Sequence, residues 1–81
     1  MTESQVPHIA VPPITVLGVQ PGEPPFRIVE IGGELAGKAT SVLDVMEIAH
    51  RAGLGHLDLD DPDVVRWVGG DKHTWTHFHW R

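Results

Sequence analysis

The residues with the most evident chemistry lie near the end of the chain, in the stretch HTWTHFHW at positions 73–80. The stretch alternates strictly, which is typical of a strand, and alternate residues of a strand share one face. One face would carry His73, Trp75, His77 and His79, and the other face would place Phe78 and Trp80 in the core. Imidazoles beside a tryptophan predict either a metal site or a contact surface.

The metal hypothesis starts from His77 and His79, an H-x-H pair that can offer two imidazoles to one zinc, nickel or copper ion. A catalytic zinc needs three protein ligands and one open position. His73 lies two steps away on the same face, and His56 or an aspartate of residues 58–63 is another candidate for the third ligand. Since the spacing does not specify that ligand, we expect no cofactor and keep zinc or nickel as the alternative.

The contact-surface interpretation adds a second tryptophan. If residues 64–68 and 73–80 form a hairpin, Trp67 lies opposite Trp75, and the two rings make a cross-strand pair. Exposed tryptophans are typical of the centre of protein interfaces. We therefore predict a partner-binding face made of Trp67, His73, Trp75, His77 and His79.

Other motifs point to structure more than to chemistry. The run DLDDPD at 58–63 offers carboxylates for a hard cation, but it lacks the calcium-loop pattern. Gly32-Gly33 and Gly69-Gly70 have neither the lysine nor the spacing of a phosphate loop, and they predict turns. Ser41 is expected to cap a helix, so no activated nucleophile is evident and we expect no enzyme.

Composition limits the remaining choices. The chain has 81 residues, no cysteine and a net charge of −5. This length predicts one domain over residues 8–81 after a disordered tail at 1–7, and the small core favours self-association as a homodimer. The acidic balance argues against nucleic acid and anionic membranes as partners. The polar N-terminus resembles neither a signal peptide nor a span, so we expect a cytoplasmic protein.

The elements that must position these residues follow from local patterns. Strands are expected at 14–19, 26–31 and 34–39, with Gly32-Gly33 as the hairpin turn between the last two. Gly37 indicates a bulge or a close backbone approach. An amphipathic helix is expected over about 41–53, capped by Ser41 and ended by Gly53. Helical spacing predicts its buried stripe: Val42, Val45, Met46, Ala49 and Ala52.

The end of the chain is more ambiguous. A short strand is possible at 56–59, and residues 64–68 are either a strand, which we favour, or one helical turn after Pro62. The predicted fold is α+β: a small, mostly antiparallel sheet of four to five short strands packed on one helix, with a C-terminal β-hairpin.

Three hypotheses for function follow. The first is a small acidic, non-enzymatic interaction or regulatory protein that self-associates and binds a protein partner through its Trp/His-rich C-terminal hairpin. The second is a histidine-ligated transition-metal protein that uses His77 and His79. The third is a winged-helix-like DNA-binding regulator built from residues 41–68 and the last hairpin, which the shortage of basic residues disfavours.

Overall fold

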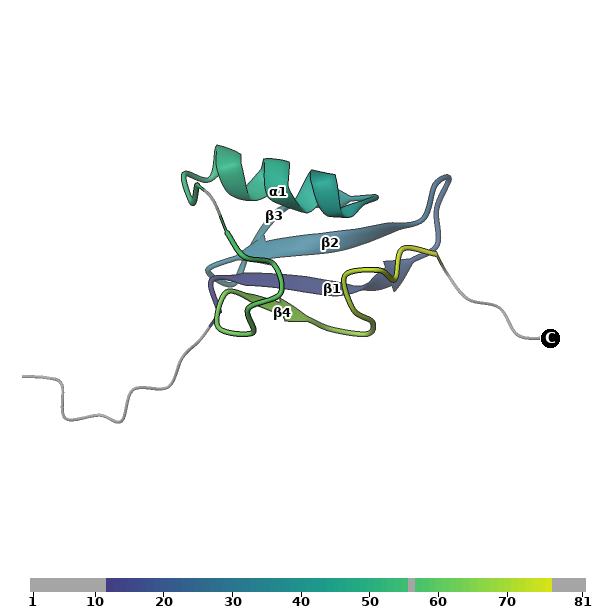
Figure 1. Cartoon of the computed structure of the whole chain (residues 1–81). Coiled ribbons are helices and arrows are strands. Elements are labelled where there is room, and N and C mark those ends of the chain that lie inside the picture. The colour runs from purple at the N-terminus through teal and green to yellow at the C-terminus, as the bar shows by residue number, and fades with distance from the viewer. Residues whose placement is uncertain (1–11, 56, 77–81) are drawn as a thin grey trace, which may run out of the picture.

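The fold is a four-stranded sheet with one helix, shown by a computed structural model that describes residues 12–55 and 57–76 (Figure 1). The elements follow one another as β1 Ile14–Gln20, β2 Phe26–Ile31, β3 Glu34–Ala39, α1 Val42–Arg51 and β4 Val65–Trp67. The strands are ordered β3-β2-β1-β4; β1 pairs antiparallel with β2, β2 pairs antiparallel with β3, and β4 pairs parallel with β1. The predicted α+β class, with one helix on a small, mostly antiparallel sheet, is confirmed; the parallel β1–β4 pair makes the sheet mixed.

The inner face of the sheet has two different covers. Helix α1 packs against β3 and β2, and the connections that follow it cross the β1–β4 half (Figure 1). The core lies between these layers and is made of Ile14, Val16, Val29, Ala39, Val45, Ala49, Leu59 and Val65. The helix therefore closes only half of the inner face, and the other half depends on irregular chain.

The β2–β3 hairpin follows its sequence signals closely. Gly32 and Gly33 have φ angles of 62° and 84°, the left-handed geometry that a two-residue turn between twisted strands requires. The register of the pair shifts between Val29 and Glu30, which is the predicted bulge near Gly37. A Cβ on Gly37 would lie 3.1 Å from Ile48 Cδ1, so glycine also permits the close approach of α1.

Helix α1 begins and ends at the expected residues. Ser41 is the N-cap, and its side chain accepts a hydrogen bond from Asp44 N at 3.4 Å. Gly53, with a φ of 84°, follows the last turn and is the expected left-handed cap. The buried stripe is narrower than predicted, however, because Met46 is 46% exposed.

The chain after β4 differs from the predicted C-terminal hairpin. β4 is a strand, as favoured for residues 64–68, but it pairs with β1, and residues 71–76 form turns and bends. The Asp71 carboxylate accepts hydrogen bonds from His73 N at 2.8 Å and Thr74 Oγ1 at 3.1 Å. This side-chain-stabilised turn replaces the extended conformation over 73–76; residues 77–81 lie outside the described part.

The short strand considered at 56–59 is also not formed by its described residues. Leu57 to Leu59 have no strand partner, and Asp58 Oδ1 accepts a hydrogen bond from Asp60 N at 2.9 Å. Such aspartate turns compete with a strand ladder for the same backbone groups. Leu59 is nevertheless buried in the core, so the irregular segment is anchored by its apolar side chain.

Candidate functional site

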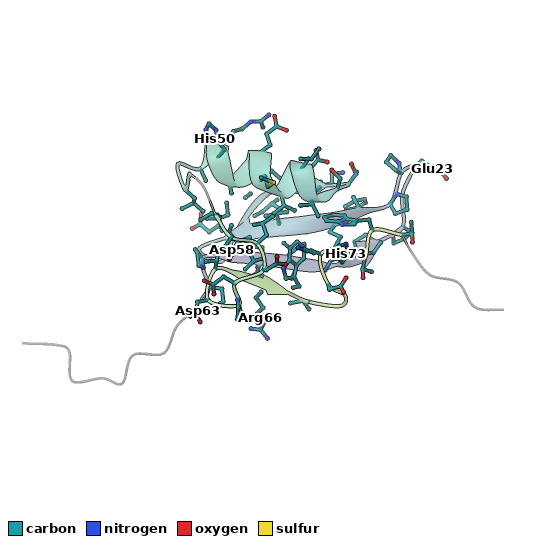
Figure 2. All side chains as sticks on the ribbon, in the orientation of Figure 1. Glu23, His50, Asp58, Asp63, Arg66 and His73 are labelled. Atoms are coloured by element: carbon teal, nitrogen blue, oxygen red, sulfur yellow. The ribbon has the colours of Figure 1, made fainter. Side chains whose placement is uncertain are left out.

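Only some of the residues predicted to form the contact surface lie close together in the structure. Trp67 and Trp75 are in contact, with ring centroids 6.3 Å apart and an interplanar angle of 86°. His73 is exposed on the turn beyond β4 (Figure 2). His77 and His79 lie outside the described residues. The contact between the two tryptophans was predicted, but they are not the cross-strand pair of a hairpin, because β4 pairs with β1 and Trp75 follows a turn.

Both tryptophans pack on a buried arginine, Arg27, for which the sequence predicted no role. Arg27 is 0% exposed and is the buried charged side chain of the described chain. Its guanidinium carbon lies 5.3 Å from the ring centroid of Trp67 and 5.3 Å from that of Trp75, within the range of cation–π contacts. The two rings are therefore half-buried partners of Arg27, which corrects the prediction of an outward-facing pair.

Arg27 uses its whole hydrogen-bonding capacity. Nε donates to Leu17 O at 2.7 Å, and the two terminal nitrogens donate to four further backbone carbonyls. Those four belong to one loop: Val68, Gly70, Asp71 and Thr74, at 2.7–3.1 Å. A guanidinium has five N–H donors, so none remains to hold an anionic ligand. Arg27 therefore fastens residues 68–74 to the sheet and is not itself a binding group.

The electrostatics agree with this structural role. Burial lowers the pKa of the Arg27 guanidinium from its ordinary value, and the nearby Asp71 carboxylate acts in the opposite direction. The pKa of Asp71 is itself lowered, first by the hydrogen bond from His73 N and then by that from the Thr74 hydroxyl. An arginine remains charged in such surroundings, so a permanent cation lies under the two rings.

One signal for Arg27 was present in the sequence. In FRIVEI, alternation places Arg27 on the same side of β2 as Val29 and Ile31, which is the side that faces the core. A charged residue on the apolar side of a strand is the unusual feature. Its carbonyl partners after β4 lie 41 to 47 residues away in sequence, and no local pattern reveals them.

Three of the four aspartates of residues 58–63 have partners within the chain. Asp58 and Asp61 each accept a hydrogen bond from the amide two residues later, both at 2.9 Å. Asp60 forms an ion pair with Lys72, with Oδ1 and Nζ 2.6 Å apart. Over residues 12–55 and 57–76, no three histidine, aspartate or glutamate side chains are grouped to hold a metal ion.

A concavity lies along α1. A groove of about 350 Å³ separates the helix from the connection that follows it. Its walls are Met46, Glu47, Ala49 and His50 on the helix, and Gly55, Leu57 and Leu59 on the connection. Figure 2 shows His50 at the C-terminal end of α1 and Asp58 on the connection below it. The groove exists because α1 covers only the β2–β3 half of the sheet.

An exposed apolar rim extends this groove. Leu43 and Met46 are 72% and 46% exposed, and residues three apart on a helix are neighbours on its surface. A second hollow of about 340 Å³ lies beside β4, but Asp60, Arg66, Asp71 and Lys72 contribute to its walls and the Lys72–Asp60 ion pair is part of it. The groove along α1 is therefore the better place for an apolar group. We call it the α1 groove.

The α1 groove is small and contains two ionisable side chains. Its volume is at the lower end of the roughly 300–1,000 Å³ typical of ligand sites. His50 and Glu47 are its titratable groups, and Glu47 Oε2 is paired with Arg51 at 3.1 Å. No hydrogen bond joins His50 to a nucleophile among the residues described. The arrangement suits one or two apolar side chains of a partner.

Comparisons with known proteins give no match for this chain. Among the described residues, no helix has the length and apolar character needed to cross a membrane. No protein-family model matches the chain, and neither the search of curated proteins nor that of solved structures gave a match.

Proposed function

We propose that this chain is a small non-enzymatic interaction module that binds an apolar segment of a protein partner in the α1 groove. The observation that carries the proposal is that the exposed Met46 lines the groove, with the exposed Leu43 next to it on the helix surface. Contiguous apolar surface next to a concavity is typical of interaction sites, whereas single exposed apolar residues are normal.

The C-terminal face remains a weaker form of the same proposal. Trp67 and Trp75 pack on Arg27 and on each other, so less of their ring surface can contact a partner. The homodimer expected from the small core stays a prediction, and light scattering across a concentration series tests it.

The two alternative functions have less support than the interaction module. The metal hypothesis now depends on His77 and His79, beyond the described residues, and metal analysis of protein purified without a nickel column tests it. The winged-helix hypothesis needs a second helix before the wing. In residues 41–68, apart from residue 56, the helix is α1 and it is followed by β4, so this hypothesis loses its recognition element.

Two surface variants test the proposed groove. Leu43→Lys with Met46→Lys places two charges on its rim, and Leu35→Lys is the control because Leu35 is 71% exposed on β3. A partner enriched on the parent protein is purified, and its affinity for each variant is measured by calorimetry. We expect the rim variant to lose binding and the control to retain it. Equal binding by both variants, or equal loss, refutes the α1 groove as the site.

A further inference from the structure

We infer that the hollow beside β4 binds a short extended segment of a protein partner as a fifth strand, with an acidic residue next to Arg66. The segment pairs in parallel with the free edge of β4 and carries an apolar residue on each side of the acidic one. This site is distinct from the α1 groove, although Leu59 contributes to both. The inference therefore does not depend on the proposed function.

The backbone of β4 has one side without a strand partner. β4 is the outermost strand of the sheet and pairs with β1. Val64 O and Val68 N are hydrogen-bonded to β1. Alternate residues of a strand direct their backbone groups to opposite sides, so those of Val65 and Trp67 point away from β1. Groups at such an edge can pair with an added strand.

The groups on that side suit one residue of a parallel strand. Val65 N donates to Asp61 O at 3.1 Å, so the connection before β4 already satisfies this donor. Among the described residues, Val65 O and Trp67 N have no hydrogen-bond partner. In a parallel pair, a residue bonds to the neighbours on either side of the residue it faces. A residue that faces Arg66 therefore donates to Val65 O and accepts from Trp67 N.

The hollow along this edge offers apolar surface to the rest of the segment. Its volume is about 340 Å³, and its apolar lining consists of Leu59, Pro62, Val65 and Trp67. Side chains of successive residues in a strand alternate between the two faces of the sheet. The two neighbours of the central residue thus lie on the same face as Val65 and Trp67, so apolar side chains suit these two positions.

The charges around the hollow select the central residue. Those of the lining are Asp60, Arg66, Asp71 and Lys72. Asp60 and Lys72 form an ion pair with each other, and the Asp71 carboxylate accepts two hydrogen bonds within its own turn. Arg66 forms no ion pair with a described residue, and Figure 2 shows its side chain extending from β4 away from the rest of the sheet. Opposite charges that face each other on adjacent strands stabilise the pair, so Arg66 favours an acidic residue.

The experiment uses three capped peptides of the sequence TTVXVTT, in which X is glutamate, lysine or N-methylglutamate. Nuclear magnetic resonance of the isotope-labelled protein measures each affinity and observes the Trp67 amide directly. We expect the glutamate peptide to bind about fivefold more tightly than the lysine peptide at low salt, because like charges on adjacent strands repel. The glutamate peptide should also slow hydrogen exchange at Trp67 N. N-methylglutamate keeps the charge but has no N–H for Val65 O, so this peptide should lose most of the affinity.

Two charge-reversal variants test the role of Arg66. Arg66→Glu should bind the lysine peptide more tightly than the glutamate peptide. Lys38→Glu is the control, because Lys38 is exposed on β3 at the opposite edge of the sheet and its replacement changes the net charge equally. This control should retain the preference for glutamate. If both variants change the preference to the same extent, net charge explains it and the inference is overturned.

The remaining outcomes separate this site from the α1 groove. The Leu43→Lys/Met46→Lys variant should bind the glutamate peptide as the parent does. A loss of binding in that variant would place the peptide in the α1 groove, so the inference would fail while the proposed function stands. Equal binding of the glutamate and N-methylglutamate peptides, an unchanged Trp67 amide, or no binding of any peptide to the parent would each overturn the inference.

Discussion

Replacing Arg27 by lysine tests how much one buried side chain contributes to this fold. Lysine keeps the positive charge but has three donors on one nitrogen, whereas the guanidinium supplies five donors in a planar fork. The five carbonyls that Arg27 satisfies belong to β1 and to the loop after β4. At least two of them must lose their donor in the Arg27→Lys variant.

The expected loss of stability follows from the cost of leaving buried carbonyls without a hydrogen-bond donor. A buried polar group without a partner costs about 1–3 kcal/mol, so two carbonyls correspond to roughly 2–6 kcal/mol. The whole protein of 81 residues is expected to have a free energy of unfolding of about 4–12 kcal/mol, from the usual 0.05–0.15 kcal/mol per residue. Arg27→Lys should therefore remove a large fraction of the stability. Arg27→Met, which leaves all five carbonyls without a donor, should remove more.

Urea unfolding followed by tryptophan fluorescence measures this effect, because Trp67 and Trp75 report on the packing around Arg27. Arg66→Lys is the control: Arg66 is an exposed arginine on β4, and its replacement should change the free energy of unfolding by less than about 0.5 kcal/mol. If Arg27→Lys unfolds at the same urea midpoint as Arg66→Lys, the hydrogen-bond network contributes no net stability. The structural role assigned to Arg27 would then be wrong.

The remaining predictions concern the helix and its contacts. Gly37→Val should destabilise the protein by about 1–3 kcal/mol through overpacking against Ile48, and Ile48→Val in the same chain should recover part of the loss in urea unfolding. Ser41→Ala should cost roughly 0.5–1 kcal/mol, the low end for an N-cap, because its hydrogen bond is long at 3.4 Å; thermal unfolding measures it. The pKa of Asp44 is lowered by hydrogen bonds from Thr40, first its backbone N–H and then its hydroxyl. A carboxylate with a lower pKa in the folded state stabilises the protein above the ordinary carboxyl pKa of about 4, and that stability is lost as the pH falls through the lowered value. Stability measured from pH 6 to 2 should therefore fall less steeply in Asp44→Asn than in the parent; equal slopes would contradict the assignment.

The parts of the fold that were predictable have short-range causes. The Gly32-Gly33 turn and the helix limits at Ser41 and Gly53 depend on the conformations of single residues and on their immediate neighbours. Gly37 was expected to mark a bulge or a close approach, and the structure has both. Signals of this kind are contained in a few consecutive residues, so they can be interpreted without knowledge of the tertiary structure.

The stretch HTWTHFHW shows where pattern alone is insufficient. Its alternation predicts a strand from His73, but the Asp71 carboxylate binds His73 N and the Thr74 hydroxyl and closes a turn instead. Arg27 then draws the carbonyls of Asp71 and Thr74 to the sheet. Neither set of hydrogen bonds follows a repeating pattern in the sequence. Those of Arg27 join residues more than forty positions apart.

The α1 groove was missed for a related reason. Helical periodicity placed Met46 in the buried stripe, and it specifies correctly which residues share a side of the helix. It does not specify where the helix lies across a sheet. Because α1 packs on β3 and β2, Met46 lies at the groove between the helix and the connection that follows it, and it is 46% exposed. The candidate site is thus a consequence of helix placement, which local sequence does not encode.

The arginine network and the groove are physically connected. Trp67, which packs on Arg27, donates from Nε1 to Leu59 O at 3.0 Å, and Leu59 forms part of the groove wall. Residues that hold the loop after β4 therefore also hold one side of the α1 groove. A change at Arg27 would alter stability and binding together and could not separate them. Leu43 and Met46 lie on the exposed rim, away from this chain of contacts, and for that reason they are the residues at which binding can be tested without unfolding the protein.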